Sequence, residues 1–200
     1  MFIVDVKSRD GIYKGGFVRN SILSCLIFCF MLSAFAMAGD SDFETNTVYF
    51  EKVTAKPGEH FAVKVYLANV DDLAGCQVPI FYRHEKINLW CDSISFKDSR
   101  MEYFSFNDIK LPQTEDADKV AFFAYIASID PDVYTDPLSK GDGLLATLYF
   151  TAPKDCPEGK VELKRGMIPH PHVSYVYSLW DASGNEVDSD FQESTITIKK

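Results

Sequence analysis

Hydrophobic and polar residues alternate along two neighbouring stretches of this chain, on either side of a short polar break. In the first stretch, Phe61 to Leu67, every second residue is apolar, and a Pro57-Gly58 turn precedes it. The second stretch covers residues 75–82. Because successive side chains of a strand point to opposite faces, this alternation predicts two strands that bury one face and expose the other.

Segments of the same kind recur along the chain, separated by turns rich in Gly, Pro, Asn and Asp. The segment 119–128 is apolar at nearly every position, so we expect both of its faces to be covered. The pattern contains no convincing amphipathic helix. With about nine short strands, it predicts an all-β fold, an antiparallel β-sandwich with jelly-roll topology. The other predicted strands are 47–50, 87–91, 144–150, 161–164, 173–180 and 194–199.

The first 38 residues have the pattern of a signal peptide. Four basic residues precede an apolar run from Ile22 to Leu32, and Ala36-Met37-Ala38 offers a small-residue cleavage site before Gly39. The alternative is an uncleaved membrane anchor, although residues 22–38 are short for a spanning helix. We therefore expect a leader at 1–38, a disordered lead-in at 39–46 and one domain at 47–200, located outside the cytoplasm as a secreted, periplasmic or cell-surface protein.

The charge of the chain narrows the choice of partners. The formal net charge is −9, and loss of the leader's four basic and two acidic side chains would make it −11. Such a surface repels phosphate backbones, so nucleic acid is not expected as a partner. After signal cleavage no membrane contact is expected either.

Three cysteines remain outside the leader: Cys76, Cys91 and Cys156. An odd number allows at most one bridge within the chain. Cys76–Cys91 is the most natural pair, since it would join one strand to the next along the chain, and export favours oxidation. The alternative is three buried thiols, because a free cysteine packs like a small apolar residue.

Three motifs of this chain resemble the cohesin-type domain, which belongs to a superfamily that also contains carbohydrate-binding modules. The first is the opening Ala55-Lys56-Pro57-Gly58-Glu59 with its alternating strand. The second is Asn69 to Gly75 followed by Val78 to Tyr82, and the third is Asp142 to Phe150. The resemblance spans residues 48–198, although Arg83 stands where the family usually has Asp after the tyrosine.

The resemblance implies a module that binds a protein partner, such as a dockerin, through one face of a sheet. On the strand that matches the recognition sheet of the family, the outward positions would be Gln77, Pro79 and Phe81. An outward aromatic such as Phe81 is a plausible anchor for a partner. The alternative for Phe81 is that a second layer, or the bend at Arg83, covers it.

Catalysis is not expected, because none of the common catalytic or phosphate-binding motifs is present. His170 and His172 lie in a Pro-His-Pro-His segment that could pinch Zn²⁺ or Cu²⁺, but no further ligand has suitable spacing. Two acidic clusters give calcium more support as a bound ion, since hard oxygen ligands suit Ca²⁺. Their candidate ligands are Asp130, Asp132, Asp136, Asp181 and Asp188, with solvated acidic turns as the alternative.

A carbohydrate-binding module is the second hypothesis for the function, since polysaccharide binding needs aromatic faces for the sugar rings. The candidates are Trp90, Tyr134 and Trp180. Most of the 16 Phe and 10 Tyr must fill the core of a chain of this size. A structural or adhesive domain stabilised by Ca²⁺ is the third hypothesis. A contiguous apolar patch would favour protein binding, and a row of coplanar exposed rings would favour glycan binding.

Overall fold

The computed structural model describes residues 43–104, 106–112, 119–127, 135–172 and 174–200, which lie within one compact unit, Asp40–Lys200. Across these ranges the chain forms strands and turns, and no helix occurs. Accordingly, none of the described segments is a helix that could cross a membrane. The predicted leader and the first half of the predicted lead-in, residues 39–42, lie outside the described residues.

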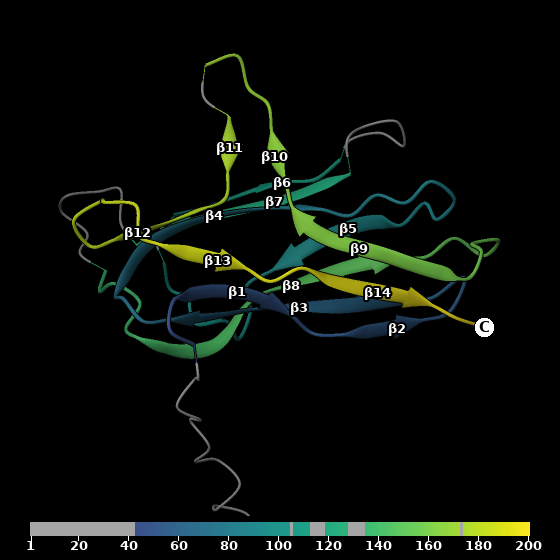
Figure 1. Cartoon of the computed structure of the whole chain (residues 1–200), viewed down its shortest axis with the longest axis horizontal. Helices are drawn as coiled ribbons and strands as arrows, with labels where there is room; N and C mark the ends of the chain where they lie inside the picture. Colours follow the sequence, from purple (N-terminus) through teal and green to yellow (C-terminus); the bar gives the residue numbers. More distant parts are fainter. Residues whose placement is uncertain (1–42, 105, 113–118, 128–134, 173) are drawn as a thin grey trace, which may run out of the picture. The chain divides into compact units, whose positions relative to one another are not determined.

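The strands form two large sheets and one small hairpin (Figure 1). Sheet one has the order β13-β1-β3-β8-β5. Its strands are β1 Asn46–Phe50, β3 His60–Asn69, β5 Trp90–Ser95, β8 Gly141–Thr151 and β13 Ser189–Phe191. Most neighbours are antiparallel, but β13 runs parallel to β1 at the edge.

Sheet two has the order β2-β14-β9-β4-β7-β6, and β12 also pairs with β4. Its strands are β2 Val53–Ala55, β4 Leu73–Phe81, β6 Phe106–Lys110, β7 Val120–Ile126, β9 Gly159–Arg165, β12 Ser178–Asp181 and β14 Ser194–Ile198. The small hairpin joins β10 Met167–Ile168 to β11 Tyr175–Val176. Because β14 pairs with both β2 and β9, the fold continues almost to the end of the chain.

The core lies between the inner faces of the two sheets. Sheet one contributes the alternate residues of β3 and β8 that the sequence predicts, including Val63, Val65 and Leu148. Sheet two contributes alternate residues of β4 and β7, such as Val78 and Phe123. The predicted all-β antiparallel sandwich is therefore confirmed, since two half-buried sheets can hide their apolar faces only against each other.

Some predicted strands begin elsewhere in the structure. Residues 87–89 form a loop although their apolar residues are buried, and β5 starts at Trp90. The predicted strand 173–180 is split into β11 and β12, which pair with different partners. Alternation marks which side chains are buried, but a loop whose side chains enter the core gives the same pattern.

Arg100 fastens the loop between β5 and β6 to the ends of β3 and β8. Its guanidinium donates four hydrogen bonds: to Leu67 O (3.1 Å), Asn69 Oδ1 (2.7 Å), Gly141 O (2.9 Å) and Ser139 O (2.6 Å). Burial lowers the pKa of Arg100 from its ordinary value, and Asp142 counters this shift. The side chain crosses Gly143 so closely that a Cβ there would lie 2.6 Å from Arg100 Cδ.

Candidate functional site

Alternate residues of β4, β7 and β6 form an outer face of sheet two. Cys76, Val78 and Ile80 point into the core, so the odd-numbered residues of β4 from Gly75 to Phe81 face outward. The strand register then aligns Gln77 with Ala124 of β7, and Ala124 with Asp108 of β6. Because the next position on each strand is two residues away, a second outward row contains Gly75, Ile126 and Phe106.

Trp180 of β12 extends this second row, because β12 pairs with β4 and aligns Trp180 with Gly75. The glycine at position 75 allows this close approach, since a Cβ there would lie 3.3 Å from Cε3 of the indole and 3.0 Å from the carbonyl oxygen of Tyr125. The flat strand surface at Gly75 therefore leaves room for the tryptophan ring.

An arm, defined as residues 166–172 and 174–176, covers the other end of this face. It contains the β10–β11 hairpin, which projects from the molecule beside β4 (Figure 1). At its base the backbone N–H of Gly166 donates to Pro79 O (2.9 Å). The Tyr175 ring lies 5.0 Å from the ring of Phe122, which is outward-facing but fully buried. The arm thus explains why the outward-facing Phe122 of β7 is buried.

Lys110 of β6 strengthens the contact between the arm and the sheet. Its ammonium lies 4.6 Å from the Tyr175 ring centroid and 5.3 Å from that of Phe122, within the range of a cation–π interaction. The same ammonium pairs with the carboxylate of Asp108. The charge of Asp108 is therefore balanced on its own strand.

Between the arm and β12 the outer face is hollowed into a groove of about 670 Å³. Ile126 on its floor is 38% exposed, which makes it one of the exposed large apolar side chains among the described residues. Side chains from β4, β6, β7, β11 and β12 line the groove, chiefly Gln77, Phe106, Ala124, Ile126, Tyr175 and Trp180. Mostly apolar walls with few polar groups are typical of a surface that binds an apolar side chain of a partner.

The three residues that the sequence predicts for the protein-binding face have different environments. Gln77 is half-buried and lines the groove. Pro79 is buried, since the base of the arm lies on it, and the expectation that it forms part of an open face is wrong. Phe81 is half-buried beside Gly166, whose added Cβ would lie 3.1 Å from Phe81 N. The alternation of β4 carries no signal for the arm, because a strand pattern does not show what packs on the outer face of the strand.

The predicted glycan-binding aromatics do not form one platform. Trp90 lies on β5 of sheet one and Trp180 on β12 of sheet two, and Lys119 Nζ lies 4.6 Å from the Trp90 ring centroid. Tyr134 lies outside the described residues. The half-buried rings of Phe43, Tyr49 and Tyr66 form a row that the sequence analysis missed, stacked face to face at 5.3 and 5.2 Å. Stacked rings cover one another's faces, whereas a sugar platform needs those faces free.

Of the predicted calcium ligands that the structure describes, Asp181 and Asp188 line one hollow of the surface, whereas Asp136 is exposed and is not among its lining residues. Asp130 and Asp132 lie outside the described residues, so a site in their loop stays a prediction. Asp181 instead accepts hydrogen bonds from the backbone N–H groups of Ser183 (2.8 Å) and Asn185 (2.9 Å), and its pKa is lowered by these bonds, chiefly those from Asn185. Among the described residues no three His, Cys, Asp or Glu side chains converge as metal ligands.

The predicted Cys76–Cys91 bridge is absent, and the alternative of buried thiols describes the structure. Cys76 lies on β4 of sheet two and Cys91 on β5 of sheet one, because the chain crosses between the sheets after Tyr82. Both are free and buried, as is Cys156. Burial raises the pKa of Cys76 and of Cys91 to about 12.

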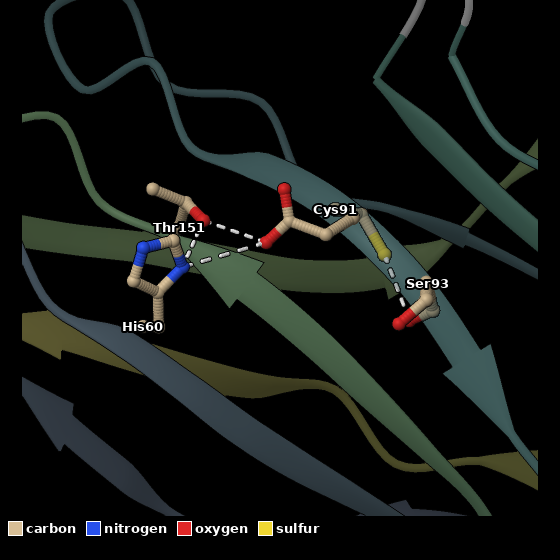
Figure 2. A network of polar contacts seen from close by, with 5 residues as sticks. His60, Cys91, Ser93 and Thr151 are labelled. Atoms are coloured by element: carbon tan, nitrogen blue, oxygen red, sulfur yellow. Dashed lines mark hydrogen bonds and ion pairs between the residues drawn. The ribbon is translucent and has the colours of Figure 1, made fainter.

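A Thr–His–Asp cluster on sheet one is the nearest approach to catalytic chemistry (Figure 2). The hydroxyl of Thr151 donates to Asp92 Oδ2 (2.6 Å), and His60 Nδ1 lies 2.7 Å from the same hydroxyl oxygen. Asp92 reaches this position because a β-bulge interrupts the register between Cys91 and Ser93. The histidine does not stand between the acid and the hydroxyl, so the order needed for nucleophile activation is missing. The cluster instead links β3, β5 and β8.

His170 and His172 lie at the exposed end of the arm. Their ring centroids are 5.7 Å apart, and the backbone N–H of His172 donates to His170 Nδ1 (3.3 Å). The ring of His170 also contacts Tyr175 edge-on at 5.9 Å. Among the described residues no further His, Cys, Asp or Glu side chain joins these two imidazoles to complete a metal site.

The fold and the groove together define a β-sandwich of the binding-module class. The family model described as "Cohesin domain" matches residues 47–168, about three fifths of the chain, so the chain belongs to the cohesin domain family. This confirms the family resemblance seen in the sequence. A search of curated proteins found no match.

Solved cohesin structures have the same fold at low sequence identity. A Clostridium thermocellum cohesin from a Coh-OlpA–Doc918 cohesin–dockerin complex is 17% identical, with a TM-score of 0.56, covering 78% of this chain and 100% of its own. A non-cellulosomal cohesin from Archaeoglobus fulgidus is 16% identical (TM-score 0.56; 78% and 92%). The CaCohA2 structure from Clostridium acetobutylicum is 19% identical (TM-score 0.55; 78% and 92%).

Proposed function

We propose that this chain is an exported, non-catalytic cohesin module that binds a protein partner through the groove on the outer face of sheet two. The observation that carries the proposal is the groove itself, an apolar hollow between the arm and β12 with Ile126 exposed on its floor. The family supports the protein partner, since one similar structure is of a cohesin in complex with a dockerin. The signal-like leader supports export to the cell surface, periplasm or medium.

The arm changes which residues of β4 can contact the partner. Pro79 is buried by the arm, so binding would centre on Gln77, Ile126 and Trp180 instead of on Pro79 and Phe81. A buried apolar anchor that excludes water from the centre of an interface supplies most of its affinity. Polysaccharide binding is less favoured, because the candidate tryptophans lie on different sheets.

Affinity capture from the secreted proteins of the source organism tests this proposal. The bait is the chain with Ile126→Asp, compared with the unaltered chain and with Tyr149→Asp as the matched control. Tyr149 is 44% exposed on sheet one, so both variants place the same charge on an exposed apolar position. We expect Ile126→Asp to lose a protein that the unaltered chain and Tyr149→Asp both retain. Equal capture by all three baits would refute the groove as the docking site.

A further inference from the structure

A second hollow of opposite character lies next to the groove. This acidic hollow, of about 470 Å³, lies beside the turn that follows β12. Asp181 and Ala182 line both hollows, so the two share a wall. A partner segment that fills the groove therefore passes directly beside the acidic hollow.

Four carboxylates surround the acidic hollow, with Lys140 as the one basic side chain among its described lining residues. The acids are Asp71, Asp72, Asp181 and Asp188. No ion pair between described residues involves any of them. Their hydrogen bonds come from neutral groups, such as Asn46 Nδ2 to Asp71 (2.8 Å) and the backbone N–H of Lys140 to Asp72 (3.2 Å). Neutral donors thus hold Asp71, Asp72 and Asp181 in place without cancelling their charge.

The groove, by contrast, offers little net charge to a partner. Apart from Asp181, which it shares with the acidic hollow, its one acid is Asp108, which is paired with Lys110. Its other lining residues carry no charged side chain. An apolar site and a negative site thus lie side by side on one surface. The formal charge of −9 adds a negative field that attracts basic partners over a longer range.

We propose that the partner docks with a basic amphipathic segment, which places an apolar side chain in the groove and adjacent Lys or Arg side chains at the acidic hollow. This inference rests on the proposed function and adds the chemistry of the partner to it. The apolar anchor supplies affinity, whereas the charges set orientation and association rate. A partner segment with acidic residues in the same place is repelled.

Four labelled helical peptides of about 15 residues test the proposal by fluorescence anisotropy with the full chain. The first carries Phe and Leu one turn apart, followed by three Lys residues. The second replaces the Lys residues with Glu, the third replaces Phe and Leu with Ser, and the fourth makes both replacements. We expect the first to bind about tenfold more tightly than the second in about 50 mM NaCl, with the gap closing in about 500 mM NaCl. The third loses about tenfold in affinity.

Two variants, with one matched control, separate the contributions of the acidic hollow and of the groove to peptide binding. Asp72→Asn with Asp188→Asn removes two charges from the acidic hollow, and Asp155→Asn with Glu158→Gln removes two from an exposed turn elsewhere. Only the first pair is expected to abolish the preference for the Lys peptide. Ile126→Asp is expected to weaken the first peptide at least tenfold.

Other results of the peptide measurements would contradict either the basic partner or the whole proposal. Equal affinity for the Lys and Glu peptides, with both lost in Ile126→Asp, overturns the basic partner and leaves the groove as a docking site. Undiminished binding of the first peptide to Ile126→Asp shows that the groove is not the anchor site and overturns the proposal. A Lys preference that both paired variants remove alike, or that neither removes, shows attraction to the general negative surface and also overturns it. Absence of binding by all four peptides also overturns it, while the capture experiment independently decides the proposed function.

Discussion

Removal of the Arg100 guanidinium is the sharpest test of how this sandwich is held together. Arg100→Met keeps a stem that can lie over Gly143 but loses all four hydrogen bonds. A hydrogen bond contributes about 1 kcal/mol net, and the half-exposed position reduces the total, so we expect the free energy of unfolding to fall by about 3 kcal/mol. For a chain of this size that corresponds to a decrease in Tm of about 6–12 °C.

Urea unfolding followed by tryptophan fluorescence measures this change, and two further variants control it. Arg100→Lys retains the charge but cannot reach all four acceptors from one ammonium, so we expect roughly half the loss. Tyr103→Ala alters a side chain of the same loop that is 86% exposed, and should change the free energy by less than about 0.5 kcal/mol. A loss below about 1 kcal/mol for Arg100→Met, or equal values for Met and Lys, would refute the reasoning.

Three further predictions concern the arm, the thiols and the turn after β12. Tyr175→Ala removes the contacts with Phe122 and Lys110, and should lower the free energy of unfolding by about 1–2 kcal/mol in urea, whereas an unchanged midpoint would show that the arm is held elsewhere. Iodoacetamide at pH 8, read by peptide mass spectrometry, should label Cys76 and Cys91 only in denaturant because burial raises the pKa of each thiol to about 12; a cross-linked Cys76–Cys91 peptide would contradict the structure. The hydrogen bonds that lower the pKa of Asp181 stabilise the fold fully above about pH 4, the unfolded pKa, and this contribution is lost as the pH falls through the lower folded pKa. Asp181→Asn should therefore reduce the difference in urea midpoint between pH 6 and pH 2, and an undiminished difference would count against it.

Cross-strand contacts explain why part of the site escaped the sequence analysis. Gln77 was predicted to face outward, and the alternation of β4 was sufficient for that prediction. Tyr175 and Trp180 come about a hundred residues after Gln77 in the sequence. Nothing in the residues around either ring indicates that it lies close to Gln77 in space. Their approach depends on β12 pairing with β4 and on the arm folding back over Pro79. The Cys76–Cys91 prediction failed for a related reason, since consecutive strands can belong to different sheets.

The amino-acid sequence by itself determined the all-β class, the inner faces of the long strands and the negative charge of this protein. Alternation carries that information because a strand has two faces and one of them must leave water. Sheet order, the placement of the arm and the meeting of the groove with the acidic hollow were decided only by the tertiary structure. These features depend on which distant segments share a sheet, and period-two alternation is the same whichever neighbour a strand acquires.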